Sequence, residues 1–372
     1  MTVEKRKELR VVVVGAGIFG LSCAMACAER GMAVTVLERN APGAGASGGV
    51  VGAPSPFLPA PWNPKKQTQL DALVAAEAHW ARIAELSGQD LGYARVGRLI
   101  PIASGPALDR AEAMVEAARA NWPERFIWEL VAPDDLPGWI APGAAPFGAV
   151  RETLSARLNP RATLHSLAGA LMALGGVLQL GANVIGLRSG GGVMTADGPV
   201  AADAVVLATG SGGAALTQAA LGRAVPGRMV KGQAALLASD QPRMPLIFSD
   251  GLYVVAHGDG SVAVGSTSEA DWDSAEETNS QLDALIARAR AICPDLSNAP
   301  VALRWAGLRP RAPRPEPLVG ALPGAPGVFL ADGGFKIGFG LAPVVGAAIA
   351  RMITGETSPL PEAFSPAAHG LG

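Results

Sequence analysis

Residues 10–38 read RVVVVGAGIFGLSCAMACAERGMAVTVLE, and this stretch decides the fold. Residues 10–14 are a β-branched run of the kind that forms a buried parallel strand. After three glycines, residues 18–30 are mostly small and apolar and predict a helix, which Gly31 ends. Residues 33–38 return to strand-forming side chains. The order strand, glycine turn, helix, strand predicts a βαβ unit.

The glycines stand at Gly15, Gly17 and Gly20, which is the G-x-G-x-x-G spacing of dinucleotide-binding turns. The first permits a tight turn, the second lets the backbone approach a pyrophosphate, and the third lets helix and strand pack closely. The helix N-terminus adds positive potential for phosphate. Glu38 ends the next strand, about 20 residues further on, where a carboxylate can bind ribose hydroxyls. We therefore predict dinucleotide binding in preference to a plain glycine-rich turn.

The same stretch has a second interpretation, because residues 11–28 carry no charge and follow the basic segment KRKELR. Such a pattern resembles a signal peptide or a membrane span. The spaced glycines and the strand that follows explain it as strand, turn and helix instead. We therefore expect no leader peptide and no membrane association.

The composition indicates a globular protein that binds small ligands. Of the 372 residues, 49% are hydrophobic and 17% are charged, and the net charge is −2, so no basic surface for nucleic acid is indicated. The three cysteines and four histidines lack metal-ligand spacing, so we predict no metal site. We expect a reduced, cytoplasmic protein, and the sequence allows a homo-oligomer.

Two patterns of secondary structure alternate along the chain. One pattern alternates strands and helices and covers residues 1–62, 153–226 and 305–372. The other is rich in short strands and covers residues 63–152 and 227–304. We therefore predict an α/β protein with a discontinuous Rossmann-like nucleotide-binding domain and a β-sheet-rich substrate-binding domain.

Periodicity and turn residues predict the remaining elements. The predicted helices cover residues 69–86, 107–120, 159–174, 279–292 and 342–353. The predicted strands cover residues 96–101, 126–131, 148–152, 177–180, 182–187, 204–208, 229–237, 246–256, 261–266 and 328–331.

Further glycine-rich segments indicate which dinucleotide is bound. Residues 43–49 read GAGASGG, and a second strand, which ends in Thr209-Gly210, lies far downstream. This additional backbone surface suits a long, enclosed FAD better than NAD, which has to enter and leave.

Residues 45–49 also satisfy the G-x-S-x-G pattern of hydrolases, which would make Ser47 a nucleophile. That pattern needs a strand directly before it and a helix directly after it, and residues 40–43 intervene here. We interpret Ser47 as a hydroxyl or helix-capping group near the FAD phosphates.

Arg309 lies in the apolar segment LRWAGLRPRAP, residues 303–313. Its guanidinium cannot lose its proton, so burying it is costly unless an anion meets it in a fixed geometry. A protein carboxylate such as Glu316 or the carboxylate of a ligand can supply that anion.

These segments together resemble the FAD-dependent D-amino-acid oxidase superfamily, and most closely its glycine oxidase and sarcosine oxidase branch. The resemblance runs almost end to end and rests on the segments VVVVGAGIFG, VLER, GASGGVVG, LNPRATL, ADAVVLATG, LYVVAHGDGSVAVGST, WAGLRPRAP and ADGGFKIGFGLAP. It implies an FAD-binding domain of the GR2 type. Residues 318–350, where covalent sarcosine oxidases attach the flavin, contain no cysteine, so we expect noncovalent FAD.

The resemblance also implies roles for individual residues. Arg309 matches the arginine that pairs with the substrate carboxylate, and Tyr253 matches a tyrosine whose hydroxyl helps to hold it. Lys336 stands where glycine oxidases have an arginine; it either contacts the carboxylate or the flavin, or is a solvated loop lysine. Tyr253 could equally be an amphipathic core residue.

Further positions are implied in the same way. Candidate walls of the substrate pocket are Phe248, Ser268 and Trp305. The residues implied to bind FAD are Gly15, Gly17, Ile18, Phe19, Gly20, Glu38, Arg39, Ala46, Ser47, Val51, Gly52, Ala53, Val184, Thr209, Gly210, Gly334, Phe335, Lys336, Ile337, Gly338, Phe339 and Gly340.

The expected function is oxidation of a small amino or imino acid of the glycine, sarcosine or D-amino-acid type. A hydride passes from the α-carbon to flavin N5, the imine hydrolyses, and O2 reoxidises the flavin to give hydrogen peroxide. One alternative is a dehydrogenase with a quinone or protein acceptor. A second is a tRNA-modifying oxidase domain, which the segments GASGG and PSPFLP resemble, and a third is a flavin-bound scaffold without turnover. Gly334 and Phe335 replace a His-aromatic pair of the family, which leaves the substrate open.

Overall fold

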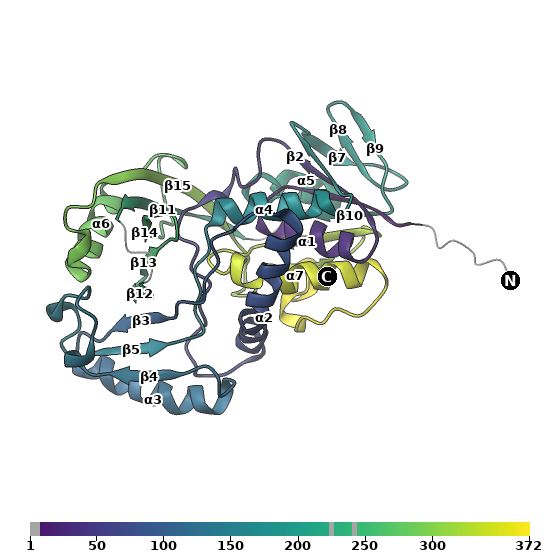
Figure 1. The fold of residues 1–372 in the computed structure, drawn as a ribbon. Helices are drawn as coiled ribbons and strands as arrows, with labels where there is room; N and C mark the ends of the chain where they lie inside the picture. The colour runs from purple at the N-terminus through teal and green to yellow at the C-terminus, as the bar shows by residue number, and fades with distance from the viewer. Residues whose placement is uncertain (1–7, 223–226, 240–243) are drawn as a thin grey trace.

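The computed structural model describes residues 8–222, 227–239 and 244–372, and it has the mixed α/β architecture that the sequence predicts. Two large sheets lie on opposite sides of the molecule, and a small three-stranded sheet covers one of them (Figure 1).

The N-terminal βαβ unit forms as predicted. It consists of β1 (Arg10–Val14), α1 (Ile18–Glu29) and β2 (Ala33–Glu38). The β1 strand pairs in parallel with β2 on one side and with β10 (Ala204–Leu207) on the other. The six-stranded sheet has the order β16 (Leu318–Ala321), β17 (Val328–Asp332), β10, β1, β2 and β6 (Val177–Leu180).

The alternating valines of β1 pack in two different cores, because successive side chains of a strand point to opposite faces. Val11 and Val13 pack with α1 and with three further helices, α2 (Pro64–Ser87), α4 (Pro160–Ala173) and α7 (Gly338–Ile353). Val12 and Val14 pack with α5 (Ala214–Leu221) and with the small sheet formed by β7 (Val184–Leu187), β8 (Val193–Thr195) and β9 (Gly198–Val200). Both faces of the parallel sheet are therefore covered, which agrees with its continuous apolar strands.

The eight-stranded sheet carries the second half of the fold. Its order is β15 (Val301–Arg311), β11 (Arg228–Ala238), β14 (Ser261–Gly265), β13 (Leu252–Ala256), β12 (Leu246–Ser249), β3 (Arg98–Pro101), β5 (Ala149–Glu152) and β4 (Trp128–Val131). The α6 helix (Ser280–Ile292) covers one face through Leu282 and Ile286, and α3 (Gly105–Asn121) packs beside β4. The other face turns toward residues 50–53.

One predicted strand was wrong. Residues 246–256 form the two strands β12 and β13, joined by a turn at Asp250-Gly251 with φ values of 43° and 80°. An Asp-Gly pair with positive φ at both positions is the preferred two-residue hairpin turn, so this hairpin has a local cause. It sets Phe248 opposite Tyr253.

Other differences concern strands and helix starts. The strands β8, β9, β15 and β16 and the helix α5 were not predicted. The β15 strand contains Pro310, which is tolerated because β15 is the edge strand of its sheet. The α7 helix begins at Gly338 rather than near residue 342, and α2 begins at Pro64, where the Asn63 side chain caps it by accepting from the N–H of Lys66.

The division into two domains stays a prediction. We propose that it follows the sheets: β15 keeps residues 301–311 in the eight-stranded sheet, and the chain enters the six-stranded sheet at Leu318. Among the described residues, no helix combines the length and the apolar character needed to cross a membrane.

The close contact between α1 and α7 yields a stability prediction. A Cβ atom on Gly346 of α7 would overlap the carbonyl of Ser22 in α1, so the two helices meet backbone to backbone. Because overpacking of this kind costs about 1–3 kcal/mol, we expect Gly346→Ala to lower the apparent Tm of the FAD-bound protein in a thermal melt.

The matched control is Gly105→Ala in the first turn of α3, where a Cβ meets no atom within 4 Å. This variant should melt at or above the wild-type temperature, because alanine favours helix. Equal melting temperatures for Gly346→Ala and the wild type would show that α1 and α7 separate without cost.

Candidate functional site

The glycine turn between β1 and α1 is closely packed at both ends. Gly15 has a φ of 103°, and a Cβ there would lie 2.5 Å from the carbonyl oxygen of Ala208. A Cβ on Gly20 would overlap the carbonyl of Gly15. Because only glycine fits, α1 starts directly at the turn, and the N–H groups of its first turn have no intrahelical acceptor. This arrangement suits a phosphate group.

Two side chains bind the backbone of this turn. Ser47 Oγ accepts a 3.0 Å hydrogen bond from the N–H of Ile18. The Glu38 carboxylate accepts from the N–H groups of Ala16 and Asn40, both at 2.8 Å. Each carboxylate oxygen keeps a second lone pair, so Glu38 can still accept from ribose hydroxyls.

The position of Ser47 excludes the hydrolase interpretation of residues 45–49. The preceding strand, β2, ends at Glu38, and Ser47 lies in a short 3₁₀ turn, Ala46–Gly48. The nucleophile elbow needs a strand directly before the serine. Ser47 acts here as a hydrogen-bond acceptor at the start of α1.

The predicted cofactor-binding residues 334–340 lie beside the same turn. A Cβ on Gly334 would lie 2.8 Å from the Phe19 ring, and one on Gly338 would lie 3.4 Å from the Ile18 side chain. The N–H of Phe335 donates to the carbonyl of Pro310 at 3.1 Å. This loop therefore joins the glycine turn to β15.

Residues 46–53 connect the glycine turn with the eight-stranded sheet. A Cβ on Gly49 would lie 3.3 Å from the Trp305 ring, and one on Gly265 would lie 2.6 Å from Val51 Cγ2. Gly52 has a φ of 58° and accepts from the N–H of Leu158, while Ala53 packs in the same cluster as Val51.

The remaining predicted cofactor residues lie around the six-stranded sheet. Arg39 lies close to Gly212, just after Thr209 and Gly210, and Val184 packs in the cluster that contains Val14 and Leu37. The structure thus gathers the Gly15–Gly20 turn, residues 46–53 and residues 334–340 around the start of α1. Their role in binding FAD stays a prediction.

The candidate substrate residues share one face of the eight-stranded sheet. The strand registers place four residues in one row across β15, β11, β14 and β13, namely Trp305, Ala234, Gly265 and Tyr253. Paired residues point to the same face, and Arg309 shares it because it is four residues beyond Trp305 on β15. This surface, which we call the site face, lies on the side of residues 50–53.

Arg309 is 8% exposed and lies flat against the backbone of β11. A Cβ on Gly232 would overlap its guanidinium, so glycine provides the space. Its Nη1 donates to the carbonyl of Thr267 at 3.2 Å, and its guanidinium carbon is 6.0 Å from the centroid of the Trp305 ring. Burial lowers the pKa of Arg309 to about 10, and the negative charge of Glu269 opposes this effect.

No carboxylate in the described part of the chain lies within 4.0 Å of the Arg309 guanidinium nitrogens. Glu316, the protein partner considered from the sequence, pairs instead with Arg314, whose Nε lies 3.8 Å from Glu316 Oε2. A buried guanidinium without an adjacent carboxylate is suited to bind the carboxylate of a ligand.

Sequence reasoning missed the carboxylate behind Arg309. Glu269 is 6% exposed, accepts from Gln233 Nε2 at 2.9 Å and from the Thr267 hydroxyl, and lies 3.9 Å from Lys231 Nζ. Lys231 and Gln233 flank Gly232 on β11, so their side chains point to the face opposite Arg309. Glu269 therefore stabilises Arg309 electrostatically across the sheet without occupying its hydrogen-bonding edge.

Lys336 lies beside the end of β15. Its Nζ is 5.6 Å from the centroid of the Phe335 ring, and the Arg311 guanidinium carbon is 5.3 Å from the same ring. Lys336 is exposed at its surface, but the atoms packed around its ammonium remove part of its hydration. This desolvation lowers the pKa of Lys336, and the charges of Arg309 and Arg311 lower it further. No described carboxylate pairs with Arg309, Arg311 or Lys336, so this part of the site favours binding of an anion.

A buried ion pair on the site face was also missed. Arg98 on β3 is 4% exposed, and its Nε lies 3.0 Å from Oε1 of the fully buried Glu152 on β5. Its Nη1 donates to the Tyr253 hydroxyl at 3.2 Å. The Tyr253 ring packs on Phe248 with the ring centroids 4.7 Å apart. No local signal reveals this pair, because Arg98 and Glu152 meet only through the register of β3 and β5.

The three candidate wall residues differ in position. Phe248 and Trp305 lie on the site face, whereas Ser268 is exposed. Within the described ranges, no group of three His, Cys, Asp or Glu side chains could hold a metal ion, and the three cysteines are buried and unbonded.

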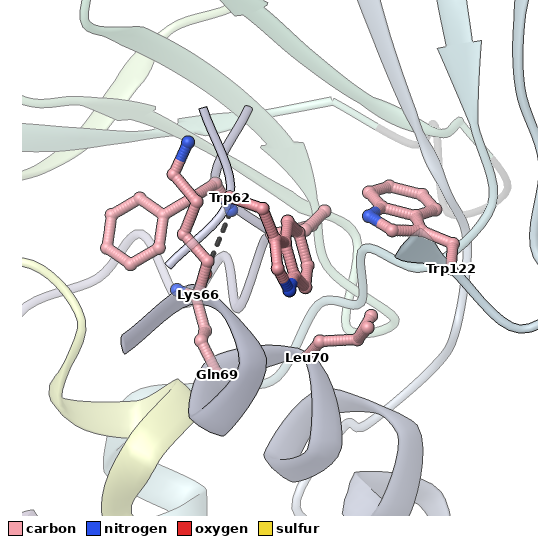
Figure 2. Close-up of a pocket in the computed structure, with 7 residues that line it drawn as sticks. Trp62, Lys66, Gln69, Leu70 and Trp122 are labelled. Carbon is pink, nitrogen blue, oxygen red and sulfur yellow. Dashed lines mark hydrogen bonds between the residues drawn. The ribbon is translucent and has the colours of Figure 1, made fainter. Parts of the chain in front are cut away.

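A small hollow lies near the site face, between residues 56–62 and α2 (Figure 2). Phe57 donates its N–H to Gln69 Oε1 at 2.8 Å across it, and Trp62 and Trp122 close its apolar side. The carbonyl of Pro56 accepts from Arg98 Nη2 at 3.2 Å. Residues 56–62 are therefore fixed to the edge of the site face.

Comparison with known proteins places these features in a family. The model of the family described as FAD dependent oxidoreductase (DAO) matches residues 10–352. The glycine oxidase of Pseudomonas putida is 32% identical over 365 residues, which cover 93% of this chain and 94% of that protein. The glycine oxidase of Pseudomonas aeruginosa is 31% identical over 377 residues, with 96% and 98% covered. The solved structure of glycine oxidase from Geobacillus kaustophilus superposes with a TM-score of 0.86 at 24% identity, with 96% and 98% covered.

The contact between Gly232 and Arg309 predicts a selective loss of carboxylate binding. In Gly232→Ala the added Cβ displaces the guanidinium, so we expect the Kd for acetate, measured by titration calorimetry on the FAD-bound protein, to rise about tenfold. Gly186→Ala, on a strand where a Cβ meets no atom within 4 Å, is the control and should bind acetate normally. Wild-type affinity in Gly232→Ala would show that the guanidinium position does not matter.

Proposed function

Because the chain belongs to the family of FAD-dependent oxidoreductases, we propose that it oxidises the C–N bond of a small amino or imino acid whose carboxylate is bound by Arg309. The observation that carries the proposal is the buried Arg309 guanidinium, which lies on the site face and has no described carboxylate within pairing distance. Relatives named glycine oxidase support a substrate of the glycine, sarcosine or D-amino-acid type.

The residues at the start of α1 fit FAD. Gly15 and Gly20 leave room only for backbone, so first-turn N–H groups other than that of Ile18, which is bonded to Ser47, can hold the pyrophosphate, and Glu38 retains acceptors for a ribose. Residues 334–340 join this turn to β15 and would hold the flavin end. The bound flavin supplies the hydride acceptor. We propose that it is held noncovalently, since residues 318–350 contain no cysteine.

The side chains of the site face orient the substrate. Arg309 can bind a carboxylate with two parallel N–H groups, which fixes both position and orientation. Tyr253 can donate its hydroxyl to the same carboxylate, and the rings of Trp305 and Phe248 limit access of water. With the carboxylate fixed, the α-carbon has one orientation, so alignment supplies much of the rate enhancement.

The positive charges of Arg309, Arg311 and Lys336 also select the protonation state of the amine. Loss of hydride from the α-carbon requires the lone pair of a neutral amine. The charges of Arg309, Arg311 and Lys336 disfavour a bound ammonium, because like charges lower its pKa. The site therefore favours the reactive neutral form without needing a dedicated base.

The remaining parts of the proposal concern the acceptor and the cell. We propose that O2 accepts the electrons and gives hydrogen peroxide, and that the protein works in the cytoplasm. A quinone or protein acceptor is the alternative that the acceptor measurement below distinguishes. The net charge of −2 argues against the tRNA-modifying alternative.

An anaerobic substrate screen tests the proposed function. Glycine, sarcosine, D-alanine, D-proline and iminodiacetate are mixed with the FAD-bound enzyme, and at least one should bleach the flavin absorbance. Air is then admitted and peroxide is measured. A panel without any bleaching contradicts the proposal, and bleaching that air does not reverse with peroxide indicates the dehydrogenase alternative.

Arg309→Leu should lower kcat/KM for the active amine on the order of 10²-fold or more, because two charge-assisted hydrogen bonds are lost, while FAD stays bound. Arg314→Leu is the control, since Arg314 is half-exposed and pairs with Glu316. It should retain wild-type kinetics. Unchanged kinetics in Arg309→Leu would remove the carboxylate-binding role.

The lowered pKa of Lys336 predicts a pH dependence of carboxylate binding. Lys336 loses its proton at a lower pH than an ordinary lysine, so the site loses positive charge as the pH rises through that lowered pKa. We expect acetate affinity in the wild type to fall as the pH rises through the lowered pKa of Lys336, below the range in which an ordinary lysine titrates. At pH values well below the Arg309 pKa of about 10, Lys336→Met should bind acetate more weakly with a flat profile, and Lys336→Arg should bind with a flat profile near wild-type affinity.

If Lys336→Met instead reproduces the wild-type affinity and its pH profile, Lys336 is a solvated loop lysine. The calorimetric titration gives both quantities from one set of measurements.

A further inference from the structure

The three nitrogens of Arg98 are used in three directions. Nη1 donates to the Tyr253 hydroxyl at 3.2 Å, Nη2 donates to the carbonyl of Pro56 at 3.2 Å, and Nε lies 3.0 Å from Glu152 Oε1 as an ion pair without hydrogen-bond geometry. With 4% of its surface exposed, this side chain is fixed between β5, β13 and residues 54–62.

Glu152 is fixed in turn, which makes the pair rigid. Its Oε2 accepts from the N–H groups of Leu154 at 2.8 Å and Ser155 at 3.0 Å, and its Oε1 accepts from the Ser155 hydroxyl. These bonds hold Glu152 in place opposite Arg98, whose charge it compensates. Arg98 is therefore not a second binding site for a substrate carboxylate.

The contact with Arg98 determines whether the Tyr253 hydroxyl acts as hydrogen-bond acceptor or donor. Arginine carries only donors, so the Tyr253 oxygen must be the acceptor in their hydrogen bond. The hydroxyl proton then points away from Arg98. Among the described residues, the Tyr253 hydroxyl donates no hydrogen bond, so the donor is free for a ligand.

The sheet places this free donor on the same face as Arg309. Tyr253 pairs with Gly265 of β14, and Gly265 pairs with Ala234 of β11. The Arg309 guanidinium lies over Gly232 of the same β11 strand and donates to Thr267, just beyond β14. A carboxylate bound by Arg309 would therefore lie on the face that carries the Tyr253 hydroxyl and can accept a hydrogen bond from it.

We propose that Arg98 is a positioning residue that makes Tyr253 a hydrogen-bond donor to the substrate carboxylate. The inference rests on the proposed function, because it assigns a role within the same carboxylate site. Arg98 does not touch the substrate. It donates to the Tyr253 oxygen, which leaves the Tyr253 proton for the substrate, and its contacts with Glu152 and Pro56 hold it in place.

A double-mutant cycle on the FAD-bound enzyme tests the inference, with acetate as the probe and calorimetry as the readout. Tyr253→Phe removes the donor and should raise the Kd for acetate about tenfold. Arg98→Lys keeps the charge opposite Glu152 but loses the planar guanidinium that donates to Tyr253 and Pro56 in two fixed directions, so it should raise the Kd about three- to tenfold. The double variant should bind no more weakly than Tyr253→Phe alone, because both changes remove one interaction.

Two matched controls separate this role from general stability. Arg95→Lys alters a neighbouring arginine that donates to the carbonyls of Leu154 and Leu73 and does not contact Tyr253. Tyr93→Phe removes the hydroxyl of the other tyrosine, which has no hydrogen-bond partner. Both controls should bind acetate with wild-type affinity.

A second route keeps the test valid if Arg98→Lys does not fold. The pair Arg98→Met with Glu152→Gln removes both charges together, so no buried charge is left uncompensated. It should reproduce the loss seen in Tyr253→Phe and show no further loss when the two are combined.

The outcomes separate the two proposals. The inference is overturned if the increases in Kd of the two single variants multiply in the double variant, or if Arg98→Lys binds acetate with wild-type affinity. In either case, amine oxidation by the wild type leaves the proposed function intact. A wild-type enzyme that binds no acetate and oxidises no amine of the panel overturns the proposed function and the inference with it. Non-additive losses with unaffected controls support the inference.

Discussion

The burial of the Arg309 charge is the constraint on which the site depends. An arginine that is 8% exposed and has no described carboxylate within pairing distance is costly for the fold. Three features limit that cost. Gly232 lets the guanidinium lie on the β11 backbone, the Thr267 carbonyl accepts one N–H, and Glu269 supplies negative charge from the opposite face of the sheet. None of them occupies the remaining N–H groups, so the fold tolerates the charge and leaves its directional donors available.

The same strand joins the two halves of the site. Arg309 lies near the end of β15, and the next residue, Pro310, accepts from the N–H of Phe335 in the loop that contacts the α1 turn. Arg311 and Gly334 form a further bridge between the same two segments. The position of the carboxylate-binding group relative to the cofactor-binding turn is therefore set by backbone hydrogen bonds. Such a link suits a reaction whose rate depends on alignment to within a fraction of an ångström.

The parts of the fold that the sequence predicted are those with local causes. The β1 valines, the glycines of the turn and Glu38 all lie within one βαβ unit, where periodicity and spacing suffice. The Asp250-Gly251 hairpin also has a local signal, and it was missed because the apolar residues on both sides resemble one long strand. The β15 strand was missed for a different reason. Gly307 and Pro310 argue against a strand, and only its place at the sheet edge, which no local pattern shows, makes Pro310 acceptable.

In the candidate site, Arg309, Tyr253 and Lys336 could be named in advance because they stand in short segments that resemble a known family. Arg98, Glu152 and Glu269 could not, since each acts through a partner that only sheet register brings close.

These missed groups determine the charge balance of the site. Arg98 is compensated by Glu152, and the negative charge of Glu269 is shared between Lys231, 3.9 Å away, and Arg309 across the sheet. The charge that remains at the site face belongs to Arg309, Arg311 and Lys336. One small carboxylate compensates it in part, whereas an added ammonium increases the repulsion. The arrangement therefore selects an anionic molecule with a neutral amine. Because lysine titrates far more readily than arginine, Lys336 makes the strength of this selection depend on pH while Arg309 keeps its direction fixed.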